Sequence, residues 1–473
     1  MSTTRQIAHN TIVQITGKIL STFLGLLAIG IMTRYLGQEQ FGWYVTAITF
    51  LQFVGILIDF GLIPVTAQML SEPHFDKKKL LKNLLGFRFV SAVLFLGLAP
   101  LAALLFPYPR EVKIAISFTS LSFLAIAMNQ VLVGYYQHKL SMHMQAMGEV
   151  IGRVFLIGGL WFVTTKGYGF LPVMTVVTLS SLVYTAVLWI HVYQKEKTGF
   201  SFEATIWKAI MTKMWPIAIS IIFNVVYLKG DTIILSLFWP QETVGIYGAA
   251  YRVIDILAQT AMMLMGLMLP ILAFNWSRNI KAEFKHRYQQ AFDAMMMLAF
   301  PMLIGVLVLA KKIMVLVAGE EFVASGSALQ ILALAVFGVY LGAVFGHTAV
   351  AINKQKQTMW IYISDAVLTL IGYLIFIPVY GIMGAAWMTV FSELYAGLLL
   401  WIVIRHYSGV SLEMKTFSKI VFSSLVMGSA LIILNRFNVL LLVLIAAAVY
   451  SLFLFGLDGI SKKTMREIVS MRE

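Results

Sequence analysis

The sequence predicts an all-α membrane protein with about fourteen transmembrane helices, arranged as two related six-helix lobes followed by two further helices. Composition is the first observation: 60% of the 473 residues are hydrophobic, 12% are charged, and the mean hydropathy is +0.86. Soluble domains contain about a quarter charged residues. The second observation is that apolar runs of roughly 20 residues, the length that crosses a bilayer, recur along the chain. The third is a resemblance between the two halves of the sequence. Together they predict a multi-pass membrane protein.

The apolar runs are expected to be helices, because backbone groups inside a bilayer must satisfy their hydrogen bonds within the segment or a closed barrel. An even number of spans places both termini on the same side. No cleavable leader pattern precedes the first run, so we expect the N-terminus to be retained. The expected spans are residues 12–33, 41–63, 84–106, 112–134, 147–165, 170–192, 215–238, 243–273, 291–310, 324–350, 358–378, 381–404, 417–435 and 438–457.

The distribution of the 35 lysine and arginine residues predicts the orientation. With the N-terminus inside, the inner segments carry 23 of them, the outer loops carry seven, and five lie within spans. Cytoplasmic loops are enriched in these residues, so both termini are expected in the cytoplasm and the protein in the cytoplasmic (inner) cell membrane. The net charge of +14 is spread over many turns that would face anionic lipid headgroups. It therefore does not predict nucleic-acid binding.

The longest loop separates six spans from eight. Within it, Phe202, Ile206, Ile210 and Met214 recur every four residues and so share one helical stripe. This predicts either an interfacial helix linking two halves or an ordinary amphipathic connector. The expected organisation is an N-terminal six-helix lobe (1–193), a cytoplasmic amphipathic linker (194–214), a C-terminal six-helix lobe (215–405), and two additional helices with a basic cytoplasmic tail (406–473).

Two pairs of segments indicate an internal duplication. The segment "GQEQFGWYVTA" (37–47) aligns with "PQETVGIYGAA" (240–250) at an offset of 203, and the segment 168–190 aligns with 380–402 at an offset of 212. A repeat of six spans gives both copies the same topology. Parallel repeats of this kind occur in two-lobed transporters, whose substrate site lies between the lobes near the midplane.

The sequence resembles the polysaccharide or O-antigen flippase family through "RYLGQEQFGWY" (34–44), "DFGL" (59–62), "GDTIIL" (230–235) and "VGIYGAAYRV" (244–253). That family belongs to the superfamily shared with multidrug and toxic compound exporters and lipid II flippases. The resemblance implies a V-shaped pair of six-helix lobes around a cationic cavity. It also implies a substrate, an undecaprenyl-pyrophosphate-linked oligosaccharide moved from the inner to the outer leaflet. After "DFGL" the family often has a basic residue where this chain has Gln68.

Cations inside the spans are candidates for binding the pyrophosphate, because a charge near the bilayer centre costs at least ~2.5–3.5 kcal/mol and needs a purpose or a partner. Lys229 lies midway along its span, and Asp231 is about 200° around the helix from it, so the two do not form a local pair. Arg252 and Asp255 are three residues apart and could neutralise each other, as could Glu149 and Arg153 at four. Arg88 lies near the end of its span, where snorkelling would explain it. The candidate cavity cations are Lys229, Lys18, Arg252 and Arg153.

Carboxylates inside the spans are candidates for coupling transport to a proton or sodium gradient. Their structural alternative is hydrogen bonding between helices. These candidates are Asp231, Asp59, Asp255, Asp365 and Glu393.

Other function classes have less support in the sequence. A membrane glycosyltransferase or polymerase would expose long outer loops, and the loops here are short, so we expect a transporter and not an enzyme. No metal site or cofactor is expected. A multidrug or metabolite exporter and a lipid II flippase remain alternatives on the same fold. The expected partners are the lipid-linked oligosaccharide, membrane lipids and H⁺ or Na⁺, with the polysaccharide polymerase machinery as a further candidate and no nucleic acid.

Overall fold

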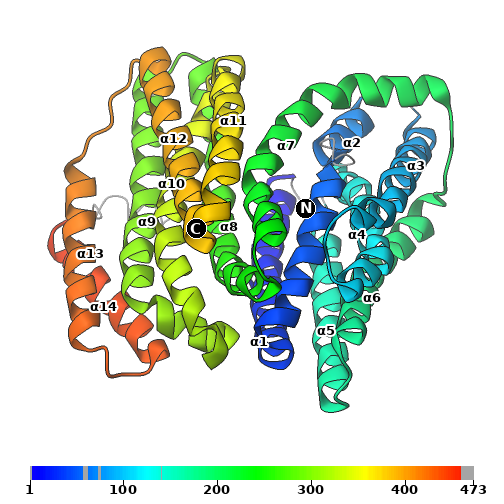
Figure 1. The fold of residues 1–473 in the computed structure, drawn as a ribbon. Helices are drawn as coiled ribbons and strands as arrows, with labels where there is room; N and C mark the ends of the chain where they lie inside the picture. Colours follow the sequence, from blue (N-terminus) through cyan, green and yellow to red (C-terminus); the bar gives the residue numbers. More distant parts are fainter. Residues whose placement is uncertain (1–2, 57–61, 73–75, 140, 460–473) are drawn as a thin grey trace. The chain divides into compact units, whose positions relative to one another are not determined.

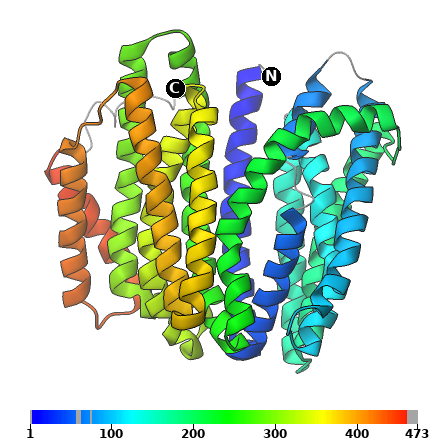
Figure 2. The ribbon, with the colours of Figure 1, turned by 45° about the horizontal axis from the view of Figure 1, so that its top comes forward.

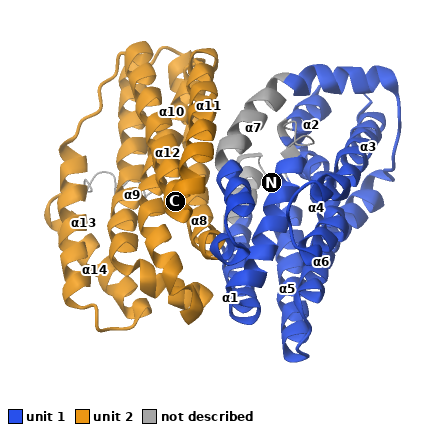
Figure 3. Cartoon of the chain, in the orientation of Figure 1, with its two compact units in different colours: residues 1–245 blue, residues 246–473 orange. Residues whose placement is uncertain are grey.

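Every element that the structure describes is a helix. The structure is a computed structural model in which residues 3–56, 62–72, 76–139 and 141–459 are described. The chain divides into two compact units, residues 1–245 and 246–473, so the boundary falls inside helix α8 (Gln241–Ser277) (Figure 3). The all-α class is therefore confirmed.

Unit 1 contains seven described helices before α8. The first is divided by Gly37, whose φ of 66° lies in the left-handed region that glycine tolerates best. This kink falls between the first two expected spans, 12–33 and 41–63. The helices are α1 (Thr3–Ile56), α2 (Leu62–Ser71), α3 (Lys77–Leu104), α4 (Arg110–His138), α5 (His143–Thr165), α6 (Phe170–Glu196) and α7 (Ala204–Phe238) (Figure 1).

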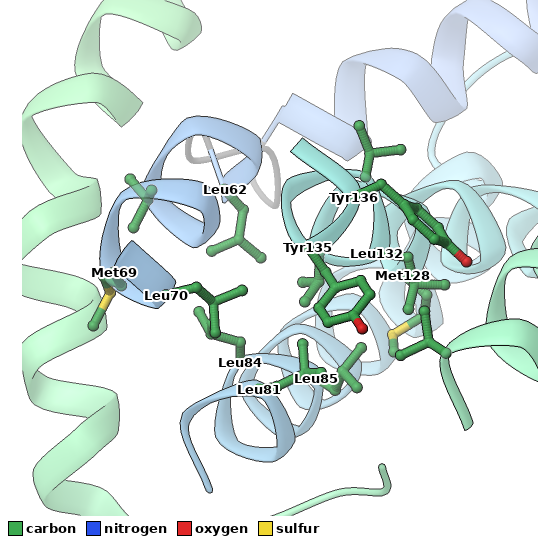
Figure 4. Close-up of a cluster of buried hydrophobic side chains, with 14 of the residues drawn as sticks. Leu62, Met69, Leu70, Leu81, Leu84, Leu85, Met128, Leu132, Tyr135 and Tyr136 are labelled. Atoms are coloured by element: carbon green, nitrogen blue, oxygen red, sulfur yellow. The ribbon is translucent and has the colours of Figure 1, made fainter. Parts of the chain in front are cut away.

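Apolar side chains hold the end of unit 1 at which α3 begins. Figure 4 shows leucines of α2 and α3 on the side of α4 that carries Tyr135, while Tyr136 points away from them. The hydroxyl of Tyr136 donates a hydrogen bond to the carbonyl of Leu188, which ties α4 to α6. Burying each large apolar side chain contributes roughly 1.5–3 kcal/mol. This cluster therefore fixes the positions of the helix ends around it.

The predicted amphipathic stripe packs against this same cluster. Ile210 and Met214 are 0% and 2% exposed and belong to it, whereas Phe202 is 60% exposed. Helix α7 runs without a break from Ala204 to Phe238, so the expected linker continues directly into the expected seventh span. The amphipathic segment thus covers apolar side chains of its own unit.

Unit 2 is built around α10, which packs against α9 and α12, while α11 packs against α12. Helices α9 to α12 run side by side (Figure 1, Figure 2). Helices α13 and α14 pack against α9 through Leu309, Met427, Leu431 and Leu442. Besides most of α8, the helices are α9 (Lys281–Ala318), the short 3₁₀ helix η1 (Glu320–Ala324), α10 (Ser325–Ala351), α11 (Gln355–Tyr380), α12 (Ile382–Ser408), α13 (Lys415–Ile433) and α14 (Val439–Gly456).

Twelve helices among the described residues are long and apolar enough to cross a membrane. One of them, Thr16–Gly55, combines the first two expected spans across the Gly37 kink. The seventh expected span, 215–238, includes residues whose side chains are not described. The protein is therefore a multi-pass membrane protein with twelve candidate spans, and the number fourteen stays a prediction.

Candidate functional site

The clearest group of charged side chains in unit 1 lies between α1 and α5, two helices in extensive contact. The Lys18 Nζ is 3.4 Å from Oε1 of Glu149, and the buried Ser21 hydroxyl donates a 2.7 Å hydrogen bond to the same oxygen. The side chain of Lys18 is still 38% exposed. One carboxylate oxygen therefore fixes a lysine and a serine of α1 at a single place.

Arg153 extends this group one turn along α5. Its guanidinium lies over Gly25 of α1, because a Cβ on Gly25 would be 3.7 Å from the Arg153 Cζ. Tyr184 of α6 interacts electrostatically with both Glu149 and Arg153, and a Cβ on Gly152 would lie 3.0 Å from the Tyr184 Cβ. We call Lys18, Glu149, Arg153 and Tyr184 the α1–α5 charge cluster. Two cations and one carboxylate give it one excess positive charge.

The other described candidate residues in unit 1 lie on α7. Asp231 is fully buried, and its Oδ1 accepts hydrogen bonds from the backbone N–H and the hydroxyl of the following residue, Thr232. Lys229 is half-buried. Farther along the helix, the Ser236 hydroxyl is 3.1 Å from that of Tyr108, which precedes α4. This part of α7 thus carries several buried polar groups.

Arg252 and Asp255 form the local ion pair that their spacing allows. The Nη1 of Arg252 is 3.6 Å from Oδ2 of Asp255, and both side chains are partly exposed, at 24% and 32%. Both residues make further interactions, so the pair is one part of their surroundings.

Asp365 and Glu393 form a second group, where α11 meets α12. Asp365 is fully buried; the Thr369 hydroxyl donates to its Oδ1 at 3.1 Å and the Ser392 hydroxyl donates to its Oδ2 at 2.9 Å. Glu393 follows Ser392 and interacts electrostatically with Asp365. Among the described residues, neither carboxyl forms an ion pair with a lysine or arginine. Hydroxyl donors, not cations, therefore satisfy Asp365.

Asp59, a candidate coupling residue, lies outside the described residues. The snorkelling interpretation of Arg88 is wrong: this side chain is 1% exposed, its Nε donates to the carbonyl of Ala127 at 3.0 Å, and its Nη2 donates to Gln130. Arg88 therefore joins α3 to α4 inside unit 1.

Sequence reasoning missed the contact between Lys18 and Glu149, because 131 positions separate them. An acidic residue within an apolar run was the signal available for Glu149. For the residues that the structure describes, no group of three or more histidine, aspartate or glutamate side chains is placed to hold a metal ion.

Comparison with known proteins decides the family. The family model described as "Polysaccharide biosynthesis protein" matches residues 7–276. The chain belongs to this family. A curated relative of this polysaccharide biosynthesis protein is the "Probable low-salt glycan biosynthesis flippase Agl15" of Haloferax volcanii, 23% identical over 439 residues and covering 90% of this chain and 89% of the relative. The resemblance seen in the sequence is thereby confirmed.

Two solved structures share the fold of this polysaccharide biosynthesis protein. The lipid II flippase MurJ in an inward closed conformation is 16% identical, with a TM-score of 0.77, covering 97% of this chain and 100% of that one. An inward-facing multidrug resistance MATE family transporter of the MOP superfamily is 15% identical, with a TM-score of 0.69, covering 84% of this chain and 98% of that one. The protein is thus a member of the polysaccharide biosynthesis protein family and has the fold of this flippase and of this MOP-superfamily transporter.

Proposed function

We propose that the protein moves an undecaprenyl-pyrophosphate-linked oligosaccharide from the inner to the outer leaflet of the cytoplasmic membrane, for surface polysaccharide biosynthesis. Membership of the polysaccharide biosynthesis protein family supports a glycan substrate. The name of the Haloferax volcanii relative describes a glycan biosynthesis flippase, and a lipid II flippase has the same fold. Alternating access is the expected mechanism for a two-lobed transporter.

The α1–α5 charge cluster is the observation that carries this proposal. A pyrophosphate that leaves water loses hydration, which cationic side chains replace by charge-assisted hydrogen bonds. Lys18 supplies a compact charge, while Arg153 adds a planar fork suited to two phosphate oxygens. Glu149 neutralises one of these cations and holds Lys18 in place. The excess positive charge favours an anionic substrate over a cationic drug.

Lys229 and Arg252 are the further cations that we propose to contact the pyrophosphate, in the same role as predicted from the sequence. Lys229 is half-buried on α7, and Arg252 forms an ion pair with Asp255 on α8. Both residues make further interactions, and we expect each to contribute to substrate binding. The coupling role of Asp59, Asp231, Asp255, Asp365 and Glu393 remains part of the proposal.

Substitution of Lys229 and Lys18 tests the function directly. In cells, externally accessible lipid-linked glycan and membrane abundance of the protein would be measured together. Lys229→Ala and Lys18→Ala should each lower the accessible glycan while abundance stays normal, and Lys229→Arg should keep much of the activity. Normal flipping by well-folded alanine variants would refute the phosphate role.

Substrate identity is tested with purified protein in vesicles. Transport of an undecaprenyl-pyrophosphate oligosaccharide, of lipid II and of a cationic dye would be compared in the same preparation. Selective movement of the oligosaccharide supports the proposal. Preference for lipid II or for the dye would instead assign the protein to one of the two alternative functions on this fold.

A further inference from the structure

A pocket of about 300 Å³ lies in unit 1 where α3 begins and where α4 and α6 end. Leu70 of α2 and Leu81 of α3 form apolar parts of its wall, next to Tyr135. The charged and polar lining is Lys77, Lys78 and Asp76 at the start of α3, His138 and Lys139 at the end of α4, and Glu196 at the end of α6. The pocket shares no residue with the α1–α5 charge cluster.

Both acidic residues of the pocket already have partners. The Asp76 carboxylate accepts hydrogen bonds from the backbone N–H groups of Lys78 and Lys79, at 2.9 and 3.3 Å. Glu196 accepts a 2.9 Å hydrogen bond from the Tyr135 hydroxyl and lies 3.3 Å from the Lys139 Nζ. His138 also has a partner, because its Nδ1 is 2.9 Å from the Ser71 hydroxyl.

Lys77 and Lys78 differ from these groups. Both are exposed, and neither forms an ion pair with a described acidic residue. They occupy the first turn of α3, which contains no acidic residue. Cations at that end of a helix are disfavoured, because the helix dipole is positive there. Three lysines and two carboxylates line the pocket, which leaves one net positive charge that an anion would neutralise.

We propose that this pocket binds the phosphate of an anionic membrane-lipid headgroup. Lysine ammonium groups bind phosphate as point charges, and basic pockets between transmembrane helices on the cytoplasmic side suit anionic headgroups. The apolar wall would contact the glycerol and the start of the acyl chains. The charge distribution of the sequence predicts this end of unit 1 to be cytoplasmic. The site goes beyond the proposed function, because it concerns a bound membrane lipid and not the transported one.

The test measures lipid affinity of the purified full-length protein in nanodiscs of phosphatidylcholine with increasing phosphatidylglycerol. The variant Lys77→Gln with Lys78→Gln removes two charges and keeps the length and helix propensity of the side chains. The matched control, Lys281→Gln with Lys356→Gln, removes two exposed lysines near the starts of α9 and α11. Circular dichroism and thermal unfolding in pure phosphatidylcholine verify that both variants fold.

We expect the Lys77/Lys78 variant to bind phosphatidylglycerol about tenfold or more weakly, since each lysine near an anionic surface contributes a factor of roughly five. The Lys281/Lys356 control should keep nearly the original affinity. Equal losses in the two variants would show a general charge effect and overturn the site. A folded Lys77/Lys78 variant with unchanged affinity would also overturn it. Competition by millimolar inorganic phosphate as effective as that by the lipid would assign the pocket to a free anion, against the lipid assignment.

Discussion

Gly42 packs against the segment that contains Gly245, and Gly245 packs against the segment that contains Gly42. A Cβ on Gly42 would collide with the carbonyl of Gln241, and a Cβ on Gly245 would collide with the carbonyl of Gln38. Gln38 and Gly42 are the residues that the offset of 203 aligns with Gln241 and Gly245. Each glycine thus meets the glutamine of the other aligned segment, at one close crossing of α1 and the start of α8.

This relationship predicts that neither glycine tolerates a methyl group. Gly42→Ala and Gly245→Ala should each destabilise the detergent-solubilised protein by about 1–3 kcal/mol or more, because helix backbones would have to separate. Thermal unfolding and membrane abundance measure the effect. The Thr46 hydroxyl, which donates a 2.6 Å hydrogen bond to the Gln241 side chain at the same crossing, should lose this contact in both variants.

The matched control is Gly266→Ala in α8, where an added Cβ meets no atom within 4 Å. Alanine is favoured over glycine inside a helix by about 1 kcal/mol, so this variant should be as stable as the original protein or more stable. If Gly42→Ala behaved like Gly266→Ala, the close crossing would not exist in the folded protein.

Substitution by alanine should have different effects at Arg153 and at Arg88: the first should lower transport, and the second should lower the amount of folded protein. Arg153→Ala should lower flipping by about tenfold or more, the scale of a lost hydrogen bond to a charged group, while the protein accumulates normally. Arg153→Lys should keep part of the activity. Accessible lipid-linked glycan and membrane abundance are measured in the same cells, and transport is divided by the amount of folded protein for each variant.

Arg88→Ala should instead lower the amount of folded protein. It would leave Gln130 without a partner and open a cavity between α3 and α4; an unsatisfied buried group alone costs roughly 1–3 kcal/mol. Its flipping rate per folded molecule should stay near the original. Normal abundance of Arg88→Ala together with lost transport would show that Arg88, and not Arg153, is the functional arginine.

The helices and their approximate ends follow from local sequence, because hydropathy acts over one or two turns. The sequence predicts two spans, 12–33 and 41–63, where the structure has one helix divided by the Gly37 kink. Partners across the fold do not follow from local sequence. The position of Arg88 along its own span predicts snorkelling, whereas two of its partners lie 39 and 42 residues away on α4. The Arg252–Asp255 pair was accessible to sequence reasoning because both residues lie on one helix. The Lys18–Glu149 contact depends on how α1 packs on α5, which no periodicity encodes.

The start of α7 should depend on pH and on Asn83. The buried Asn83 side chain accepts a 2.8 Å hydrogen bond from the Glu203 N–H, and the Lys79 Nζ is 2.8 Å from Glu203 Oε2. Hydrogen bonding from Lys79 lowers the pKa of Glu203 below its ordinary value. The Glu203 carboxylate therefore contributes fully to stability above the pKa that it has in the unfolded chain, about 4.3. This contribution is lost as pH falls through the lower pKa that Glu203 has in the folded protein.

We expect Asn83→Ala to raise amide hydrogen exchange in residues 201–210 severalfold at neutral pH, because the Glu203 N–H loses its acceptor. Glu203→Gln should raise it less, and this difference should disappear as pH falls through the lowered pKa of Glu203, where the original side chain becomes protonated as well. Peptide-resolved hydrogen exchange measures both effects. An Asn83→Ala profile identical to the original protein at neutral pH would contradict this attachment of α7.

The charge bias predicts the topology. Reporters fused after residue 193 and at the C-terminus should read cytoplasmic, and a reporter inserted within 166–169, between α5 and α6, should read external. A reversed result at either end would overturn the orientation, and with it the cytoplasmic placement of the lysine-lined pocket. Membrane integration of each fusion must be verified by carbonate extraction.

Asp365 provides the last prediction, on energy coupling. Its two carboxylate oxygens accept from Thr369 and Ser392 while Glu393 lies nearby. A buried carboxyl with hydroxyl donors and no described ion pair can gain and lose a proton or Na⁺ without breaking a salt bridge. Asp365→Asn keeps the shape and one acceptor oxygen, and the amide NH₂ that replaces the other oxygen can donate to the neighbouring hydroxyl, so the protein should insert and accumulate normally. In vesicles carrying a proton or sodium gradient, the gradient-driven stimulation of oligosaccharide transport should fall about 5- to 150-fold, the usual range of a coupling free energy.

Asp255→Asn is the comparison, because its carboxylate is already paired with Arg252 and should contribute less. If transport by the original protein ignores both gradients, neither carboxylate couples transport to an ion. If Asp365→Asn keeps full stimulation while Asp255→Asn loses it, the coupling site belongs on α8 and the hydroxyl-bonded carboxyl of α11 has a structural role.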